Sequence, residues 1–103
     1  MGDPIFFRRA GPFALRTIAA ETGAALRDEG AAERQVAGLA PIEAAGPGQL
    51  TFFDNPRFLA AFLDSKATAC FVAPRFVDRA PCELALLITP QPSRAFAQAA
   101  ALF

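Results

Sequence analysis

The stretch ACFVAPRFVDRAPCELALLI, residues 69–88, decides the fold class. It contains two runs that are apolar at every position, residues 69–73 and 84–88, and a proline follows each run within two residues. Such runs are typical of strands that are covered on both faces, as in a parallel sheet. Between the runs, residues 74–81 leave room for a short crossover helix that carries Phe76 and Val77. We therefore expect two parallel strands joined through a short helix.

The segment upstream of this stretch predicts another strand followed by another helix. Residues 49–53 are apolar and β-prone, and they follow a turn signal at residues 44–48. Asn55 and Pro56 then have the types favoured at a helix N-cap and at the first helical position. The residues expected to face the core from this helix are Leu59, Phe62 and Leu63.

The first third of the chain predicts one helix and two short strands. The helix is expected to begin after Pro12 and to stop at Gly23, a residue type common at helix C-termini. Its apolar positions at helical spacing are Leu15, Ile18, Ala19 and Thr22. Short strands are expected at residues 25–27 and 36–39, with a polar loop at 28–34 between them.

The two ends of the chain complete the prediction. Residues 5–7, Ile-Phe-Phe, suggest a short edge strand or an ordered arm. A last amphipathic helix is expected after Pro92, with Phe96, Ala99, Ala100 and Phe103 on its inner side. This helix has no stop signal, which suggests a piece cut from a longer protein; a natural C-terminus is the alternative. The fold expected for residues 1–103 is a single small α/β domain, with a mixed or parallel sheet flanked by helices.

Composition excludes several classes of function. The 103 residues include 10 basic and 10 acidic side chains, so the formal net charge is zero, and a nucleic-acid binder needs a basic surface. No apolar run approaches the ~20 residues of a membrane span. The N-terminus lacks the apolar region of a signal peptide, and the sequence therefore predicts a cytoplasmic protein.

The absence of histidine excludes much catalytic chemistry. Without His the chain has no Ser-His-Asp triad and no His-ligated metal. Cys70 and Cys82 lack metal-site spacing, and Cys70 is expected to be a small buried hydrophobe. The acidic side chains of Asp28, Glu29 and Glu33, and the amine of Lys66, are expected to lie on the solvated surface. We therefore predict no catalytic residue, no metal and no cofactor in this chain.

An aromatic turn at residues 50–58 is the candidate binding feature. Phe52 lies near the end of the expected strand, Asn55 caps the following helix, and Phe58 lies three residues further on, on the same side. These three side chains can converge on one patch. There the two Phe rings can hold a flat ring of a ligand between them, and the amide of Asn55 can contact the polar edge of that ligand ring. The alternative is that Asn55 only caps the helix and that both rings belong to the core.

The run PGQLTFFDNPRF, residues 47–58, resembles a signature of the N-terminal domain of the UDP-3-O-acylglucosamine N-acyltransferase family, which acts in bacterial lipid A synthesis. Its most specific part is the pattern Phe-x-x-Asn-Pro-basic-aromatic. Weaker pieces resemble the same domain in order and spacing, so the resemblance covers residues 13–103. These pieces are FALRTIAAETG (13–23), VAGLA (36–40), ATACFVAP (67–74) and LLITPQPSRAF (86–96).

The resemblance implies a uridine-binding module whose fold resembles the N-terminal domains of Mur ligases. Carried over by motif position, it implies that Phe52 and Phe58 stack on uracil and that Asn55 contacts the edge of the base. The position of Phe58 is often Tyr in the family, so stacking is expected to persist without a hydroxyl contact. Phe53 and Asp54 occupy variable positions and receive no role, and Arg57 is expected to face solvent.

The resemblance also implies partners. In the family the substrate is UDP-3-O-acylglucosamine, and a second domain of hexapeptide repeats carries the catalytic His, forms the homotrimer and receives the acyl carrier protein. That β-helix domain is absent from residues 1–103, so this chain alone is expected to be monomeric and catalytically inactive. Two alternatives remain open at this point: a stand-alone α/β interaction module, and the uridine-binding domain of a Mur ligase.

Overall fold

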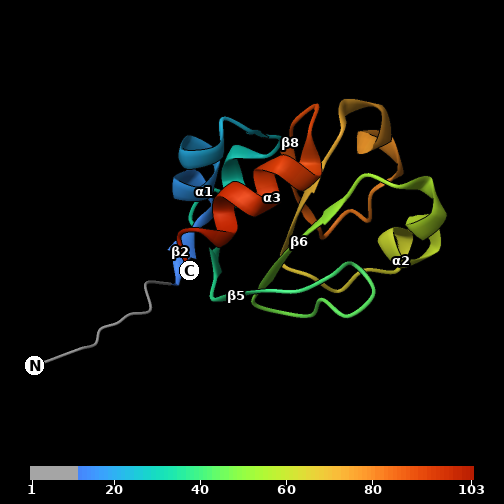
Figure 1. Cartoon of the computed structure of the whole chain (residues 1–103), viewed down its shortest axis with the longest axis horizontal. Helices are drawn as coiled ribbons and strands as arrows, with labels where there is room; N and C mark the ends of the chain where they lie inside the picture. Colours follow the sequence, from blue (N-terminus) through green and yellow to red (C-terminus); the bar gives the residue numbers. More distant parts are fainter. Residues whose placement is uncertain (1–11) are drawn as a thin grey trace, which may run out of the picture.

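The computed structural model in Figure 1 describes residues 12–103, so the strand or arm predicted at residues 5–7 lies outside the described part. A five-stranded mixed sheet forms the centre of the fold, in the order β3-β8-β7-β6-β5. Strands β5 to β8 are parallel, and β3 pairs antiparallel with β8. The strands are β3 (Ala25–Leu26), β5 (Gly38–Leu39), β6 (Gln49–Phe53), β7 (Ala69–Val72) and β8 (Ala85–Ile88). The expected α/β domain with a mixed sheet flanked by helices is confirmed.

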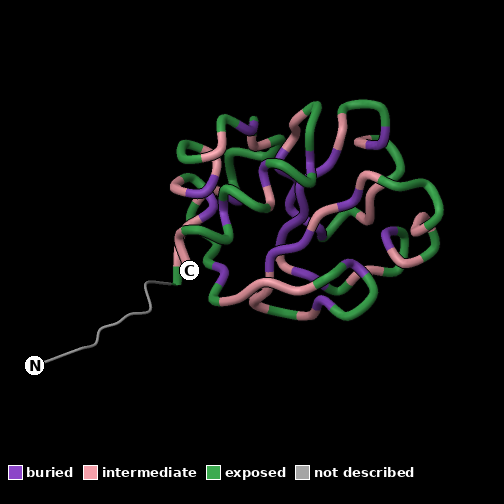
Figure 2. The backbone as a smooth tube through the Cα atoms, viewed as in Figure 1, coloured by how far each residue is buried: buried purple, intermediate pink, exposed green. Residues whose placement is uncertain are grey.

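The register of the three central strands divides their side chains between two hydrophobic clusters. Leu50 pairs with Ala69, and Thr51 pairs with Cys70. Because successive side chains of a strand point to opposite faces, Leu50 belongs to one cluster while Phe53 belongs to the other. All four residues of β7 are buried, which agrees with the apolar run that predicted the strand. Figure 2 shows this buried centre in purple.

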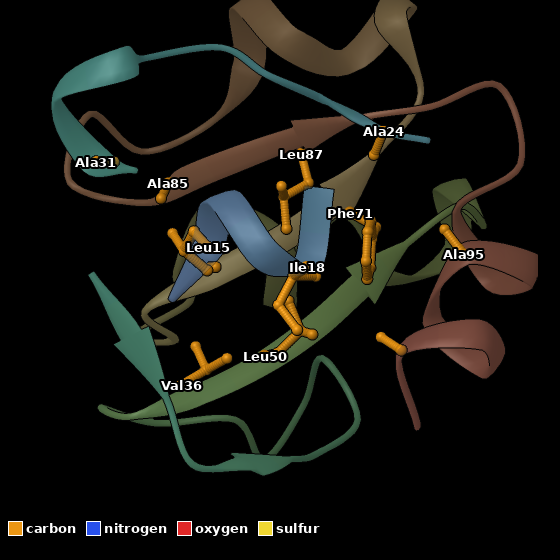
Figure 3. Close-up of a cluster of buried hydrophobic side chains, with 12 residues drawn as sticks. Leu15, Ile18, Ala24, Ala31, Val36, Leu50, Phe71, Ala85, Leu87 and Ala95 are labelled. Atoms are coloured by element: carbon orange, nitrogen blue, oxygen red, sulfur yellow. The ribbon is translucent and has the colours of Figure 1, made fainter. Parts of the chain in front are cut away.

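Two α-helices, α1 (Leu15–Thr22) and α3 (Pro92–Ala100), cover the first face of the sheet. Figure 3 shows Leu15 and Ile18 of α1 lying over Leu50, Phe71 and Leu87 of the central strands. These five side chains are fully buried. Helix α1 ends at Gly23, which has a φ of 75° and whose N–H donates to the Ala19 carbonyl, so the predicted stop is confirmed. A residue with a Cβ is strained at that φ.

Short helical segments cover the second face. They are the 3₁₀ helix η2 (Pro56–Phe58), the α-helix α2 (Leu59–Leu63) and the 3₁₀ helix η3 (Pro74–Arg79). An aromatic group holds this layer to the sheet: the Phe53 ring stacks on Phe62 with centroids 4.3 Å apart and meets the edge of Phe76 at 4.8 Å. The crossover predicted between the apolar runs is therefore present, as a 3₁₀ helix.

Several predicted details were wrong. The strand expected at residues 36–39 is two strands: β4 (Gln35–Val36) pairs antiparallel with β2 (Phe13–Ala14), whereas β5 joins the main sheet. Of the residues expected to face the core from the second helix, Phe62 is fully buried as predicted, but Leu63 is 47% exposed and not part of the core. The loop expected at residues 28–34 contains a 3₁₀ helix, η1 (Glu29–Ala31).

The last helix also differs from its predicted form. Helix α3 ends at Ala100, which is exposed, and its buried residues include Ala95 and Ala99. Phe103 lies beyond the helix but packs against Phe13, with the ring centroids 5.0 Å apart. None of the helices within residues 12–103 has the length and apolar character needed to cross a bilayer.

Candidate functional site

A pocket of about 270 Å³ lies at the carboxyl end of β6, the strand next to the edge strand β5. In open α/β sheets, ligands bind outside the carboxyl ends of the strands. The walls come from the last residues of β6, from the start of the following helical segment, and from the turn that precedes β6. The lining residues are Pro41, Ile42, Glu43, Phe52, Phe53, Asp54, Asn55 and Phe58. All three residues singled out from the sequence, Phe52, Asn55 and Phe58, thus line one pocket.

The end of β6 places two aromatic rings at the pocket on different supports. Phe52 is half-buried and points to the face covered by α3, where its ring lies 4.8 Å from that of Phe96. Phe53 points to the opposite face and is 1% exposed, held between Phe62 and Phe76. Phe53 is therefore a core residue that forms part of the pocket wall, whereas Phe52 keeps part of its ring accessible.

Asn55 serves as the N-cap of η2, as predicted. Its side-chain Oδ1 accepts a hydrogen bond from the Arg57 backbone N–H at 3.0 Å. No residue among 12–103 accepts a hydrogen bond from its amide NH₂ group, and Asn55 is exposed at the pocket. Capping and ligand contact are thus compatible, because the cap uses the oxygen and leaves the two N–H donors free.

Phe58, the last residue of η2, lines the pocket as well. It is half-buried and packs against the hydrophobic cluster of the second face, so it is neither a fully buried core residue nor a free surface residue. Arg57 is exposed, as expected, and its guanidinium carbon lies 5.7 Å from the centroid of the Phe58 ring. At that distance a cation is attracted to the ring face. The ring of Phe58 therefore has the core on one side and a cation within reach.

Sequence reasoning missed the contribution of the turn before β6. Its residues Pro41, Ile42 and Glu43 line the pocket, and the turn is closed by the N–H groups of Ala44 and Ala45, which donate to the Pro41 carbonyl at 2.9 Å. Asp54, which received no role from the sequence, lines the pocket too. No local pattern marks these residues, because the sheet alone brings the turn to the end of β6.

A larger hollow of about 460 Å³ lies at the opposite end of the sheet, where β7 and β8 begin. Its charged lining is of both signs, Arg34 and Lys66 with Asp64 and Glu83, and no aromatic ring lines it. Ligand pockets are typically apolar and aromatic with a few convergent polar groups. The smaller pocket at the carboxyl end of β6 has that chemistry, and we take it as the candidate site.

The remaining reactive groups are placed as the sequence suggests. Cys70 is fully buried, and burial raises the pKa of its thiol well above the ordinary range, whereas Cys82 is exposed. Lys66 is exposed, and Glu33 is exposed in an ion pair with Arg16 at 3.0 Å. Within residues 12–103, no group of three His, Cys, Asp or Glu side chains is placed to hold a metal ion.

Comparison with known proteins identifies relatives of the whole chain. Residues 33–102 match the family model described as UDP-3-O-(3-hydroxymyristoyl) glucosamine N-acyltransferase, LpxD. A UDP-3-O-acylglucosamine N-acyltransferase of Parvibaculum lavamentivorans is 45% identical over 103 residues, which are 100% of this chain and 29% of the relative. A protein of the same name from Methylobacterium sp. (strain 4-46) is 48% identical over 98 residues, which are 95% of this chain and 28% of the relative. The chain thus spans less than a third of these relatives.

Proposed function

We propose a function for this chain from one premise: it belongs to the UDP-3-O-acylglucosamine N-acyltransferase family. In our proposal, the chain is the part of such an enzyme that binds the uridine end of the acylated nucleotide sugar. The family names favour this function over the uridine-binding domain of a Mur ligase and over a stand-alone interaction module, which the sequence alone left open.

One observation carries the proposal: a single pocket is lined by two accessible aromatic rings and by an amide whose donors have no partner among residues 12–103. Phe52 and Phe58 come from different elements, β6 and η2, and both keep part of their surface accessible. Stacking on an aromatic side chain is worth about 1–3 kcal/mol per base. In the bound state we propose, the two rings hold uracil between them and the NH₂ group of Asn55 donates to a carbonyl at the edge of the base.

The rest of the reaction is assigned to parts of the enzyme outside these 103 residues. This chain contains no His, so we propose that the general base that activates the glucosamine amine lies elsewhere. We also propose that those parts accept the 3-hydroxyacyl group from acyl carrier protein and form the homotrimer, and that the enzyme acts in the cytoplasm on the way to lipid A. The isolated chain is then a monomer without acyltransferase activity.

Binding by the chain alone is expected to be weak. Two stacks and one hydrogen bond must offset the loss of ligand freedom, which costs several kcal/mol. The net affinity is therefore expected to be around millimolar, about −4 kcal/mol. This range suits titration of a ¹⁵N-labelled chain by NMR chemical-shift changes.

The test replaces Phe58. Phe58→Ala is expected to weaken uridine binding by about five- to a hundredfold because one stack is lost. Since Phe58 is only half-buried, the variant is expected to stay folded, and Phe58→Tyr to change little. Val77→Ala is the matched control, because Val77 is half-buried in the same cluster but does not line the pocket. It is expected to lower the melting temperature and leave uridine affinity unchanged. No uridine-dependent shifts in the wild type, with a large stability loss in Phe58→Ala, would show that Phe58 is a core residue and refute the proposal.

A further inference from the structure

We infer that the pocket at the carboxyl end of β6 binds the ribonucleoside part of its ligand and repels the phosphate part, with Glu43 and Asp54 accepting hydrogen bonds from the ribose hydroxyls. The inference deepens the proposed function and rests on it. It divides the nucleotide sugar into a portion that this chain attracts and a portion that other parts of the enzyme must hold.

The charge of the pocket lining is the first observation. Glu43 and Asp54 are its two charged residues, and both are acidic. Neither carboxylate forms an ion pair within residues 12–103, where the ion pair joins Arg16 and Glu33. No side chain or backbone N–H of this range donates a hydrogen bond to Glu43 or Asp54. Arg57 lies outside the lining, with its guanidinium near the ring of Phe58. The two carboxylates are therefore charged acceptors without a partner in this part of the chain.

The size of the pocket is the second observation. Its volume of about 270 Å³ is just below the ~300–1,000 Å³ that is typical of ligand pockets. A base with its ribose matches a space of this size, whereas a complete acylated nucleotide sugar exceeds it. Only one end of such a ligand can therefore be enclosed here.

The chemistry of the lining selects which end is enclosed. Rings and an amide suit a planar base with a polar edge, as argued above. Ionised carboxylates only accept hydrogen bonds, and ribose hydroxyls can donate them, which is how an acidic residue holds the ribose in dinucleotide-binding folds. Phosphate oxygens are acceptors that carry negative charge, so beside Glu43 and Asp54 they are repelled. The ligand is therefore oriented with its base inward, its ribose at the carboxylates and its phosphates directed out of the pocket.

A divalent cation is the other ligand that paired carboxylates suggest. Such a site needs several oxygen ligands held together. Within the described residues, Glu43 and Asp54 are not joined by a third acidic, His or Cys side chain. The aromatic walls also favour a ring over a hydrated ion, and the ribose is the occupant that uses both kinds of lining.

The test compares uridine, 2′-deoxyuridine, UMP and UDP as ligands of the 103-residue chain by NMR titration. Affinity is expected to fall by about three- to tenfold from uridine to UDP at low salt, and the difference is expected to shrink at high salt because exposed charges are screened. Loss of the 2′-hydroxyl is expected to weaken binding about fivefold or more, because a hydrogen bond to a charged acceptor is lost.

Neutral variants locate the effect. Glu43→Gln and Asp54→Asn are each expected to narrow the difference in affinity between uridine and its phosphates, UMP and UDP. Each is also expected to narrow the difference in affinity between uridine and 2′-deoxyuridine. Asp64→Asn and Glu83→Gln are the matched controls, since both residues line the hollow at the opposite end of the sheet. The controls are expected to leave both preferences unchanged. Melting curves show that each variant is folded.

Two failures are distinguishable. If uridine binds at Phe52 and Phe58 but UDP binds as tightly or more tightly, the inference is overturned while the uracil clamp stands. Equal binding of uridine and 2′-deoxyuridine, unchanged by both acidic variants, would likewise overturn it. If no uridine compound binds, the inference and the proposed function fail together.

Discussion

The ring of Phe52 lies 4.8 Å from the ring of Phe96, centroid to centroid, at an interplanar angle of 41°. Phe96 belongs to α3 and does not line the pocket, so α3 supports one wall of the site from outside. The ring that we assign to base stacking is thus braced by a helix that begins about 40 residues later in the chain. This contact links packing on the first face of the sheet to binding at the end of β6.

Replacing Phe96 tests this link. Phe96→Ala is expected to lower stability by about 2 kcal/mol because half-buried aromatic surface is lost, and to weaken uridine binding by about three- to tenfold because Phe52 gains rotational freedom. Phe103→Ala is the control, since Phe103 packs on Phe13 in the same cluster. It is expected to lower stability without changing uridine affinity. Equal uridine affinity in the two variants would show that the Phe96 contact does not support the site.

The divided role of Asn55 gives a second prediction. Because its Oδ1 already accepts from the Arg57 N–H, the two N–H donors of its amide are the groups that we assign to the ligand. The wild-type chain is therefore expected to prefer uridine to cytidine by about tenfold or more, since the 4-carbonyl of uracil accepts where the 4-amino group of cytosine donates.

Asn55→Ser and Asn55→Asp separate the two roles. Both residues are good N-caps, so the melting temperature is expected to change little. Asp removes both amide donors, so uridine affinity is expected to fall in Asn55→Asp, whereas Ser keeps one short hydroxyl donor and is expected to lose less. Titrations of uridine and cytidine into each variant measure this. Unchanged base preference in Asn55→Asp would mean that the amide does not contact the base.

Two threonines give a matched pair for stability. Thr51 is 0% exposed, and its Oγ1 has no hydrogen-bond partner among the described residues. Thr51→Val is expected to stabilise the chain by about 1 kcal/mol, because a buried hydroxyl without a partner is replaced by a methyl group of similar size. Thr68→Val is expected to destabilise it by about 1 kcal/mol, since Thr68 Oγ1 accepts from the Gly48 N–H at 2.8 Å.

Urea denaturation of both variants measures these changes. A lower free energy of unfolding for Thr51→Val would indicate that the hydroxyl has a partner in solution, such as a buried water molecule. An unchanged value for Thr68→Val would show that the Gly48 contact contributes nothing.

The buried thiol of Cys70 predicts a dependence of stability on pH. Burial raises the pKa of this thiol in the folded state above the ~8.5 of an unfolded chain. Above about pH 8.5 the unfolded chain loses the proton and the folded chain keeps it, so the free energy of unfolding falls as pH rises further, by up to about 1.4 kcal/mol per pH unit.

Denaturation between pH 7 and 10 checks this effect. The measurement is made in a Cys82→Ser background, in which Cys70 is the one remaining thiol. Adding Cys70→Ala to that background is expected to remove the part of the pH dependence of the unfolding free energy that the thiol causes. A thiol reagent is expected to modify Cys82 in the native chain and to reach Cys70 only on unfolding. Rapid native-state modification of Cys70 would contradict its burial.

Local signals predicted the elements whose causes lie within a few residues. The stop of α1 follows from the αL conformation of Gly23, and the cap of η2 follows from the Asn55-Pro56 pair. The strand predicted at residues 49–53 is the observed β6, because its apolar run is buried between two layers.

Features that depend on distant partners were not predictable in this way. Residues 36–39 form two strands because Val36 pairs with Phe13 whereas Gly38 pairs with Gln49, and no local pattern reveals that change of partner. The same holds for the pocket. The aromatic turn marked Phe52, Asn55 and Phe58, but Glu43 reaches them only through the fold of the sheet.

The central claim is that uracil lies between Phe52 and Phe58. The most direct measurement is a set of intermolecular nuclear Overhauser effects between uridine and the ¹³C-labelled chain. The account predicts contacts from the H5 and H6 protons of uracil to the ring protons of both Phe52 and Phe58, and these contacts should disappear in Phe58→Ala. Contacts that map instead to the hollow lined by Lys66 and Glu83, or saturating uridine that gives no contact to either ring, would contradict it.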